Sequence, residues 1–166
     1  AARSRRPFMS GHCRRRSVDN RRITPVAHGS VFATNRLDPG THLLLRTLAR
    51  ATAETGDAQQ RPRGAAIDLG CGSGLIATWL ASQGWSTTAI DVSRYALLST
   101  QLTARAQNAE VALRRADGLV GVPHDSVDLI VSNPPFHRGA AKDSTPTFAM
   151  IAAAKAALHP GGELWL

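Results

Sequence analysis

The stretch AAIDLGCGSGLIATWLASQG, residues 65–84, decides the fold of this chain. Residues 65–70 form a short apolar run that is typical of a buried strand, and residues 75–84 have the composition of an apolar helix that ends at Gly84. A glycine-rich turn joins the two. A strand that enters a helix through such a turn predicts the first unit of a parallel α/β sheet.

The same alternation continues after this stretch. Ser93 is placed to cap the next helix. Strands that alternate with helices of this length predict an α/β fold, with a mostly parallel sheet and helices on both faces. The expected strands are 86–91, 110–117, 126–133 and 163–166, and the expected helices are 94–107 and 146–162.

The part of the chain before residue 65 has a different character. Residues 41–54 follow a Pro-Gly pair and carry leucine and alanine at helical spacing, and residues 55–64 read as a polar linker. Residues 1 to about 24 read as irregular. We therefore divide the chain into an Arg-rich, disordered arm (1–24) and one domain (25–166), which the length of 166 residues and the apolar fraction of 43% allow.

Most of the positive charge lies at the N-terminus. The net charge of the whole chain is +8. The first 22 residues hold eight arginines and one acid, Asp19, whereas the remainder holds twelve basic and eleven acidic residues. Such an arm can neutralise nucleic-acid phosphates, can be a solvated leader, or can be an organelle transit peptide. Composition alone leaves these three interpretations open.

Cysteine usage and hydropathy argue against several classes of protein. Cys13 and Cys71 are far apart, and neither lies in a CxxC motif or near a cluster of histidines. This argues against a disulfide scaffold and against a metal site. The chain has no secretory signal and no apolar run near the roughly 18 residues that a membrane-spanning helix needs. We expect a cytoplasmic protein with no membrane partner.

Glycines and polar residues collect where the predicted strands end. The carboxyl ends of parallel strands lie at one edge of the sheet, which is where such sheets bind ligands. A polar or acidic group at each of four successive strand ends indicates a site rather than scattered surface charge. These residues are Asp68, Gly70, Gly72 and Gly74 after the first strand, Asp91 after the second, Asp117 after the third and Asn133 after the fourth.

The spacing of the glycine-rich turn departs from that of a dinucleotide-binding turn. The dinucleotide fingerprint is G-x-G-x-x-G, whereas this chain has G-x-G-x-G, with Leu75 where a dehydrogenase has its third glycine. Such glycines permit close approach of a ligand, but they also occur where a helix packs tightly on a sheet. Asp91 is placed to accept two ribose hydroxyls, and Asp117 an adenine amino proton, although either can be an ordinary surface carboxylate.

The fourth strand is followed by VSNPPFHRG, residues 131–139. Proline cannot donate to a β-ladder, so the strand has to end here. The motif can be a plain exit from the strand, with Asn133 starting a turn and Phe136 in the core. Alternatively, it presents an amide, two rigid carbonyls and an aromatic ring to a ligand, and the cluster of polar strand ends favours this interpretation.

The segments AIDLGCGSG, AIDVS, RRADGL and VDLIVSNPPFHRG, in this order, resemble the class I S-adenosylmethionine-dependent methyltransferases. The segment GSVFATNRLDPGTHLLLRTL (29–48), together with NPPFHRG, is similar to the small-domain methyltransferase family, which includes bacterial ribosomal RNA guanine-N2 methyltransferases. The resemblance covers residues from about 29 to 166. It implies a Rossmann-like sheet that usually has two more strands after the fifth, so we expect this chain, which ends at ELWL, to lack them.

The resemblance also implies roles for individual residues in binding S-adenosylmethionine. Residues 31–41 would close over its methionine end, with Phe32 and Asp38 as candidates. The glycine-rich turn would bind the methionine part of the cofactor. Asp91, at the end of the second strand, would bind the ribose, and Asp117, at the end of the third, would bind the adenine. The implied cofactor-binding residues are Asp68, Gly70, Gly72, Gly74, Asp91, Asp117 and Asn133.

The expected reaction is methyl transfer to an exocyclic amine, whose lone pair is delocalised into its ring. Two acceptors for the amine protons would aim this lone pair at the methyl group. The side-chain oxygen of Asn133 and the carbonyl of Pro134 can accept them, Pro135 stiffens the backbone, and Phe136 offers a ring on which the base can stack. The base must be unpaired or flipped, so we expect RNA as the partner, with guanine N2 of ribosomal RNA as the target.

Other interpretations stay open. The chain can be a non-catalytic RNA-binding remnant of such an enzyme, although its motifs are intact. It can also methylate adenine or a protein glutamine, because the same Asn-Pro-Pro-aromatic arrangement suits those amines. A nicotinamide-dependent dehydrogenase would need the later third glycine and would have no use for Asn133.

Overall fold

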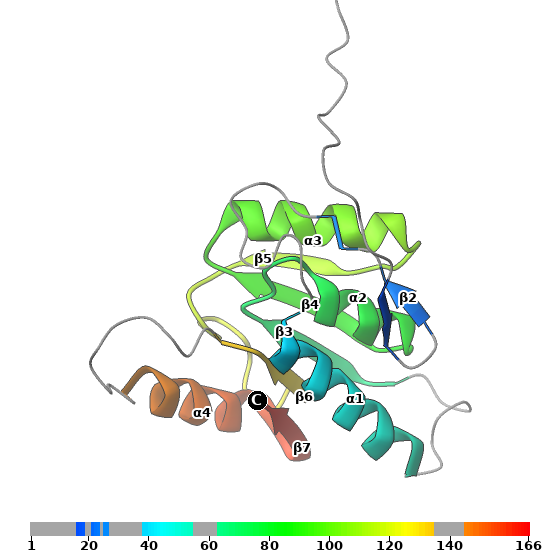
Figure 1. The fold of residues 1–166 in the computed structure, drawn as a ribbon. Coiled ribbons are helices and arrows are strands. Elements are labelled where there is room, and N and C mark those ends of the chain that lie inside the picture. The colour runs from blue at the N-terminus through cyan, green and yellow to red at the C-terminus, as the bar shows by residue number, and fades with distance from the viewer. Residues whose placement is uncertain (1–15, 19–20, 24, 27–37, 55–62, 135–144) are drawn as a thin grey trace, which may run out of the picture.

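The computed structural model of the chain describes residues 16–18, 21–23, 25–26, 38–54, 63–134 and 145–166. The strands are β1 (Arg16–Val18), β2 (Arg21–Ile23), β3 (Ala65–Leu69), β4 (Ser86–Asp91), β5 (Ala112–Arg115), β6 (Val127–Ser132) and β7 (Leu158–Trp165), and the helices are α1 (Pro39–Glu54), α2 (Leu75–Ser82), α3 (Arg94–Ala106) and α4 (Thr145–Ala157). Within the described residues, five strands form a parallel sheet in the order β5-β4-β3-β6-β7 (Figure 1). The strands β1 and β2 form a separate antiparallel pair.

The predicted α/β fold, with helices on both faces of a parallel sheet, is confirmed. The helix α2 connects β3 to β4, and α3 connects β4 to β5, so both connections run toward the β5 edge of the sheet. The helix α4 connects β6 to β7 and runs toward the opposite edge. Because parallel crossovers are right-handed, connections in opposite directions place their helices on opposite faces. Accordingly, α1 and α2 pack together on one face and α4 packs on the other (Figure 1).

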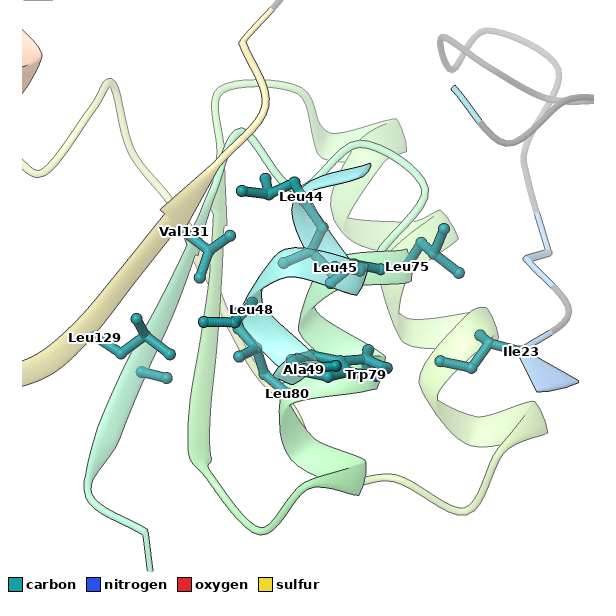
Figure 2. Packing of buried hydrophobic residues seen from close by; sticks show 12 residues of the cluster. Ile23, Leu44, Leu45, Leu48, Ala49, Leu75, Trp79, Leu80, Leu129 and Val131 are labelled. Atoms are coloured by element: carbon teal, nitrogen blue, oxygen red, sulfur yellow. The ribbon is translucent and has the colours of Figure 1, made fainter. Parts of the chain in front are cut away.

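Alternation along β3 divides the core into two layers. Ala66 faces the layer of α1 and α2, and Ile67 faces the layer of α4. In the first layer, Leu45 from α1 and Trp79 from α2 are fully buried and belong to the same cluster as Val131 of β6 (Figure 2). Burial of such side chains stabilises the fold by about 1.5–3 kcal/mol each. This packing fixes α1 against the sheet.

The N-terminal part of the domain differs from the prediction. Residues 1 to about 24 were expected to be irregular, but β1 pairs with β2 in the register Arg16↔Ile23. Ile23 is buried in the cluster of α1 and α2. Strands of three residues are too short to show a period-two pattern, which is why the sequence did not indicate them. Residues 1–15 lie outside the described residues, so the division of the chain at residue 24 stays a prediction.

The end of the last predicted helix is also wrong. The helix was expected over 146–162, but α4 ends at Ala157, and β7 begins at Leu158 rather than at residue 163. Pro160 has no N–H for a helical hydrogen bond, and the residue before a proline avoids the helical region. The Pro-Gly-Gly sequence therefore lies inside β7, where the register with β6 shifts and Gly161 has a φ of 88°. The bounds of the other predicted elements differ by at most two residues from those observed.

Candidate active site

The glycine-rich turn folds over the carboxyl end of β4. The N–H groups of Gly70 and Cys71 donate to the carbonyl of Ile90 at 2.8 and 3.1 Å, directly after the register pair Leu69↔Ile90. From the other side, the hydroxyl of Ser132 donates to the carbonyl of Leu69 at 2.8 Å. The ends of β3, β4 and β6 are thus joined at one edge of the sheet.

The three glycines of the turn lie in different surroundings, although all have positive φ. A Cβ at Gly74 would lie 2.5 Å from the Cα of Thr100, so Gly74 is required by the packing of the turn on α3. A Cβ at Gly70 would meet nothing within 4 Å, and one at Gly72 only the carbonyl of Gly70 at 3.9 Å. The backbone at Gly70 and Gly72 therefore faces open space that a ligand can enter. Gly74 is therefore explained by the tight packing of the turn on α3, whereas Gly70 and Gly72 suit a turn that a ligand approaches closely.

Two threonines of α3, Thr100 and Thr103, hold the turn from behind, and both are fully buried. Thr103 Oγ1 donates to the carbonyl of Ser73 at 2.8 Å and accepts from the N–H of Val26 at 2.9 Å. Thr100 Oγ1 lies 3.2 Å from the sulfur of Cys71. Burial raises the pKa of the Cys71 thiol to about 12, so this cysteine stays protonated and serves packing. Neither threonine was singled out from the sequence, because the partners of Thr103 lie 77 and 30 residues away.

The carboxylate of Asp91 accepts hydrogen bonds from the glycine-rich turn and from the residue before α3. Its Oδ2 accepts from the N–H of Gly72 at 3.1 Å and its Oδ1 from the N–H of Ser93 at 2.8 Å. Each carboxylate oxygen has a second lone pair, so these bonds leave acceptor capacity for hydroxyls. Asp91 both shapes the glycine-rich turn and lies at its rim, half-buried.

Asp68 lies beneath the turn. It is fully buried, and its Oδ2 accepts from the N–H of Ala77 in the first turn of α2 at 2.8 Å. Its Oδ1 has no hydrogen-bond partner in the part of the chain that the structure describes. Desolvation raises the pKa of Asp68 to about 7, and the nearby charge of Asp91 adds to the rise. Its burial suits a residue that supports the turn more than one at the surface of the pocket, and its cofactor role stays a prediction.

The structure places Asp117 two residues after the end of β5, exposed at the same edge of the sheet. The predicted residues Pro135 and Phe136, together with Phe32, lie outside the described residues. Pro134 is described and is half-buried directly after Asn133.

Asn133 meets the beginning of α1. Its Nδ2 donates to Asp38 Oδ2 and to Thr41 Oγ1, both at 2.7 Å. Asp38 also caps α1, because its Oδ2 accepts from the N–H of Thr41 at 3.0 Å. These bonds hold the pKa of the Asp38 carboxyl below its ordinary value, with the Thr41 N–H contributing most. Asp38 was predicted at the methionine end of the cofactor, and Thr41 was not singled out from the sequence.

Among the described residues, no cluster of His, Cys, Asp and Glu is arranged to hold a metal ion. No helix of the same residues is both long and apolar enough to cross a bilayer.

Comparison with known proteins decides the family. The sequence model of the methyltransferase small domain family matches residues 22–166, which include the glycine-rich turn and Asn133. The chain belongs to the methyltransferase small domain family. The resemblance found from the motifs is confirmed, and so is the Rossmann-like methyltransferase fold.

Curated relatives of this small domain are ribosomal RNA methyltransferases. Ribosomal RNA large subunit methyltransferase G of Streptomyces coelicolor is 39% identical over 145 residues, which are 85% of this chain and 36% of the relative. Ribosomal RNA small subunit methyltransferase C of Alcanivorax borkumensis is 36% identical over 141 residues, which are 85% of this chain and 41% of the relative. The chain thus spans well under half the length of these relatives.

Solved structures of similar fold are also methyltransferases. The T. Thermophilus 16S rRNA N2 G1207 methyltransferase, in complex with AdoMet and guanosine, superposes with a TM-score of 0.73 at 27% identity, over 95% of this small domain and 42% of that chain. The ribosomal protein L11 methylase of Lactobacillus delbrueckii subsp. bulgaricus gives a TM-score of 0.58 at 25% identity, over 86% of this chain and 73% of that chain.

Proposed function

We propose that this small domain transfers a methyl group from S-adenosylmethionine to the exocyclic amine of a base in ribosomal RNA, with guanine N2 as the target. The observation that carries the proposal is the orientation of Asn133 at the carboxyl end of β6. Both hydrogens of its amide are bound by α1, and its Oδ1 accepts no hydrogen bond in the described residues. An amide oxygen held in this way is an acceptor for the proton of an amine.

The open turn fits the methyl donor. S-adenosylmethionine, when bound, supplies an electrophilic methyl carbon on a sulfonium sulfur. Gly70 and Gly72 leave room against the backbone for its methionine part, and Asp91 keeps lone pairs for ribose hydroxyls. Asp117, exposed at the same edge, is the candidate for the adenine amine. The negative charge of Asp91 also favours a cationic ligand at this rim.

Asn133 lies beside this turn. Ser132 pairs with Leu69 in the parallel register, so the residues that follow them, Asn133 and Gly70, leave neighbouring strands at the same level. In the proposed reaction, Asn133 Oδ1 and the Pro134 carbonyl accept hydrogen bonds from the two N–H groups of the amine. The amine nitrogen is then pyramidal and its lone pair points at the methyl carbon. An N–C bond would form as the C–S bond breaks, S-adenosylhomocysteine would leave, and the alkylated amine would lose a proton to water. Positioning of this kind can lower a barrier by roughly 7–11 kcal/mol.

The choice of ribosomal RNA and of guanine rests on the relatives. Ribosomal RNA methyltransferases cover most of this chain at 36–39% identity, and the structure that superposes well contains guanosine. A protein that acts on ribosomal RNA works where ribosomes are assembled, which is the basis for proposing a cytoplasmic location. The Arg-rich first 22 residues suit contact with RNA phosphates.

A protein amide is the second candidate for the substrate. The likeness to a ribosomal protein L11 methylase supports a protein substrate but does not specify an amide, and this structure superposes less well than the ribosomal RNA enzyme. A non-catalytic RNA-binding remnant is the remaining alternative. It predicts a folded chain that binds no methyl donor.

The test has two steps. Calorimetric titration with S-adenosylmethionine, with NAD in parallel, asks whether the donor pocket works; binding of the former alone supports the proposal. Unmodified transcripts of 16S and 23S ribosomal RNA are then incubated with the chain and labelled donor, and methylated bases are identified by mass spectrometry. The variant Asn133→Ala should lose methylation and keep donor binding. Donor binding with methylation of adenine alone, or of protein alone, would replace guanine as the target, and a folded chain that binds no donor would favour the remnant.

A further inference from the structure

The side-chain amide of Asn133 has only one orientation that its neighbours accept. The atom that lies 2.7 Å from Asp38 Oδ2 must be Nδ2, because an ionised carboxylate accepts hydrogen bonds and cannot donate them. The lowered pKa of Asp38 keeps this carboxyl ionised at neutral pH. The second hydrogen of Nδ2 is bound by Thr41 Oγ1 at 2.7 Å. With both hydrogens of Nδ2 bound, Oδ1 is the atom of this amide that accepts no hydrogen bond in the described residues.

The first turn of α1 fits closely around this amide. A Cβ at Gly40 would come within 2.8 Å of Asp38 Oδ2 and within 3.4 Å of Asn133 Oδ1. Asp38 is held in place by the N–H of Thr41, and its own carbonyl accepts the N–H of His42 at 3.0 Å. The contact joins residues 95 positions apart in the sequence. It is therefore a tertiary contact built by the fold and not a local turn.

The element that carries Asp38 and Thr41 is rigid. Leu44, Leu45 and Leu48 of α1 are at most 7% exposed and pack against β6 and α2 (Figure 2). A site whose supporting groups stand on a packed helix holds its geometry better than one on loops. The beginning of α1 can thus define the position of the Asn133 amide.

From this geometry we infer that Asp38 and Thr41 are positioning residues, which act through Asn133 and present its Oδ1 to the substrate amine. The inference rests on the proposed function. An Asn side chain that is free to rotate would also present its NH2 group, and two donors facing each other would exclude an amine. Because Asp38 and Thr41 bind both hydrogens of Nδ2, the NH2 group of Asn133 cannot face the substrate amine. These two residues therefore make the pocket select bases that carry an exocyclic amine over bases that lack one.

The decisive variant is Thr41→Val, with Thr41→Ser as its matched control. Valine has the shape of threonine but cannot accept the Nδ2 hydrogen, whereas serine keeps the acceptor. Both variants keep the backbone N–H of residue 41, which donates to the capping carboxylate of Asp38. The probes are guanosine and inosine, which differ only in the 2-amino group, titrated in the presence of S-adenosylhomocysteine. We expect the wild-type chain to bind guanosine roughly tenfold more tightly than inosine. Thr41→Val should reduce this preference, because it frees one Nδ2 hydrogen while Asp38 still binds the other, and Thr41→Ser should retain it. Full preference in Thr41→Val would overturn the inference.

A second readout separates the inference from the proposed function. If the wild-type chain binds guanosine and inosine equally, guanine N2 is the wrong target. The orientation of the Asn133 side-chain amide can then still be tested by NMR. The side-chain 15N resonance of Asn133 is the one that disappears in Asn133→Ala. Both of its hydrogens should exchange with water more slowly than those of Asn108, which is exposed, in the wild type and in Thr41→Ser. In Thr41→Val, the hydrogen that Thr41 no longer binds should exchange faster. Exchange as fast as that of Asn108 in the wild type would overturn the inference.

Discussion

At the scale of single residues, the glycine-rich turn combines two physical demands. Gly74 begins α2 with a φ of 76° and lies against α3, whereas Gly70 and Gly72 have positive φ without any neighbour that a side chain would strike. Positive φ costs about 1–2 kcal/mol for a residue with a Cβ, wherever it occurs. Only the collision at Gly74 adds a packing cost to this strain. Substitution of each glycine by alanine therefore separates stability from ligand binding.

The first prediction concerns these glycines. Gly74→Ala should lower the free energy of unfolding by about 2–4 kcal/mol, because the new Cβ collides with the backbone of Thr100. Gly72→Ala should lose only about 1 kcal/mol but weaken binding of S-adenosylmethionine by roughly tenfold or more, since the Cβ enters the space for the ligand. Urea unfolding and calorimetry measure the two effects.

The matched control for Gly72→Ala is Gly84→Ala. Gly84 has a φ of 89°, a Cβ at this position would meet nothing within 4 Å, and the residue lies at the opposite end of α2 from the turn. Its variant should show the same small loss of stability with unchanged binding. Equal binding in both variants would contradict the assignment of the turn to the donor.

The second prediction concerns the buried carboxyl of Asp68. Its pKa is about 7 in the folded chain and 3.8 in the absence of burial, so folding favours the protonated form. The stabilising contribution is complete below pH about 4 and is lost as pH rises through about 7. Relative to Asp68→Asn, which is always neutral, the wild type should lose about 2–4 kcal/mol of unfolding free energy between pH 4 and pH 8.

Urea unfolding of both proteins over this pH range measures the difference. The comparison with Asp68→Asn cancels the titration of the other groups, because both proteins share them. Parallel pH profiles of the two proteins would show that the carboxyl is ionised at low pH in the folded chain, contrary to its position beneath the turn.

At the scale of elements, helices and strands with a local sequence pattern were predicted, whereas those that depend on contacts between distant segments were missed. The strand β3 and the helix α2 follow from the apolar run and the glycines around them. The helix α1 was predicted to begin at residue 41, two residues after its observed start at Pro39, because the Asp38-Pro39 pair was not recognised as an N-cap signature. By contrast, the hairpin of β1 and β2 packs beside α1 and α2 through Ile23, and β7 pairs with β6, so both depend on contacts between distant segments.

The residues of the candidate site likewise fall into those that the sequence predicted and those that it did not. The glycines, Asp91 and Asn133 were predicted because polar residues at strand ends are visible in one sequence. The contact of Asn133 with Asp38 and Thr41 was not predicted, since nothing local indicates that two segments 95 and 92 residues apart share one hydrogen-bond network. Thr103 was missed for the same reason, because its partners Ser73 and Val26 lie on other elements.

The third prediction concerns the link between α3 and the turn. Thr103→Val removes a fully buried hydroxyl but keeps the side-chain shape, leaving the Ser73 carbonyl and the Val26 N–H without this partner. The expected loss of unfolding free energy is about 1–3 kcal/mol. Thr103→Ser keeps the hydroxyl and should lose less. A Thr103→Val protein as stable as the wild type in urea unfolding would show that the hydroxyl does not tie the turn to α3.

At the scale of the whole molecule, the candidate site is where the described elements converge. The turn after β3 is bonded to the end of β4, to α3 and, through Thr103, to residue 26, while β6 brings Asn133 to the beginning of α1. Opening the site therefore breaks contacts in both halves of the sheet. A ligand that binds the closed arrangement should stabilise the entire fold rather than one loop.

This gives the last prediction. A ligand that binds only the folded state adds about 2.7 kcal/mol to the free energy of unfolding when its concentration is a hundred times its Kd. S-adenosylmethionine and S-adenosylhomocysteine should therefore raise the unfolding temperature of the chain in a concentration-dependent way, and NAD should not. The rise should be absent or much smaller in Gly72→Ala and retained in Gly84→Ala, because both share the backbone strain and only Gly72 lies at the turn. The same small rise with all three ligands would mean that the edge of the sheet binds nucleotides without selectivity, and the methyl-donor pocket would have to be sought elsewhere in the fold.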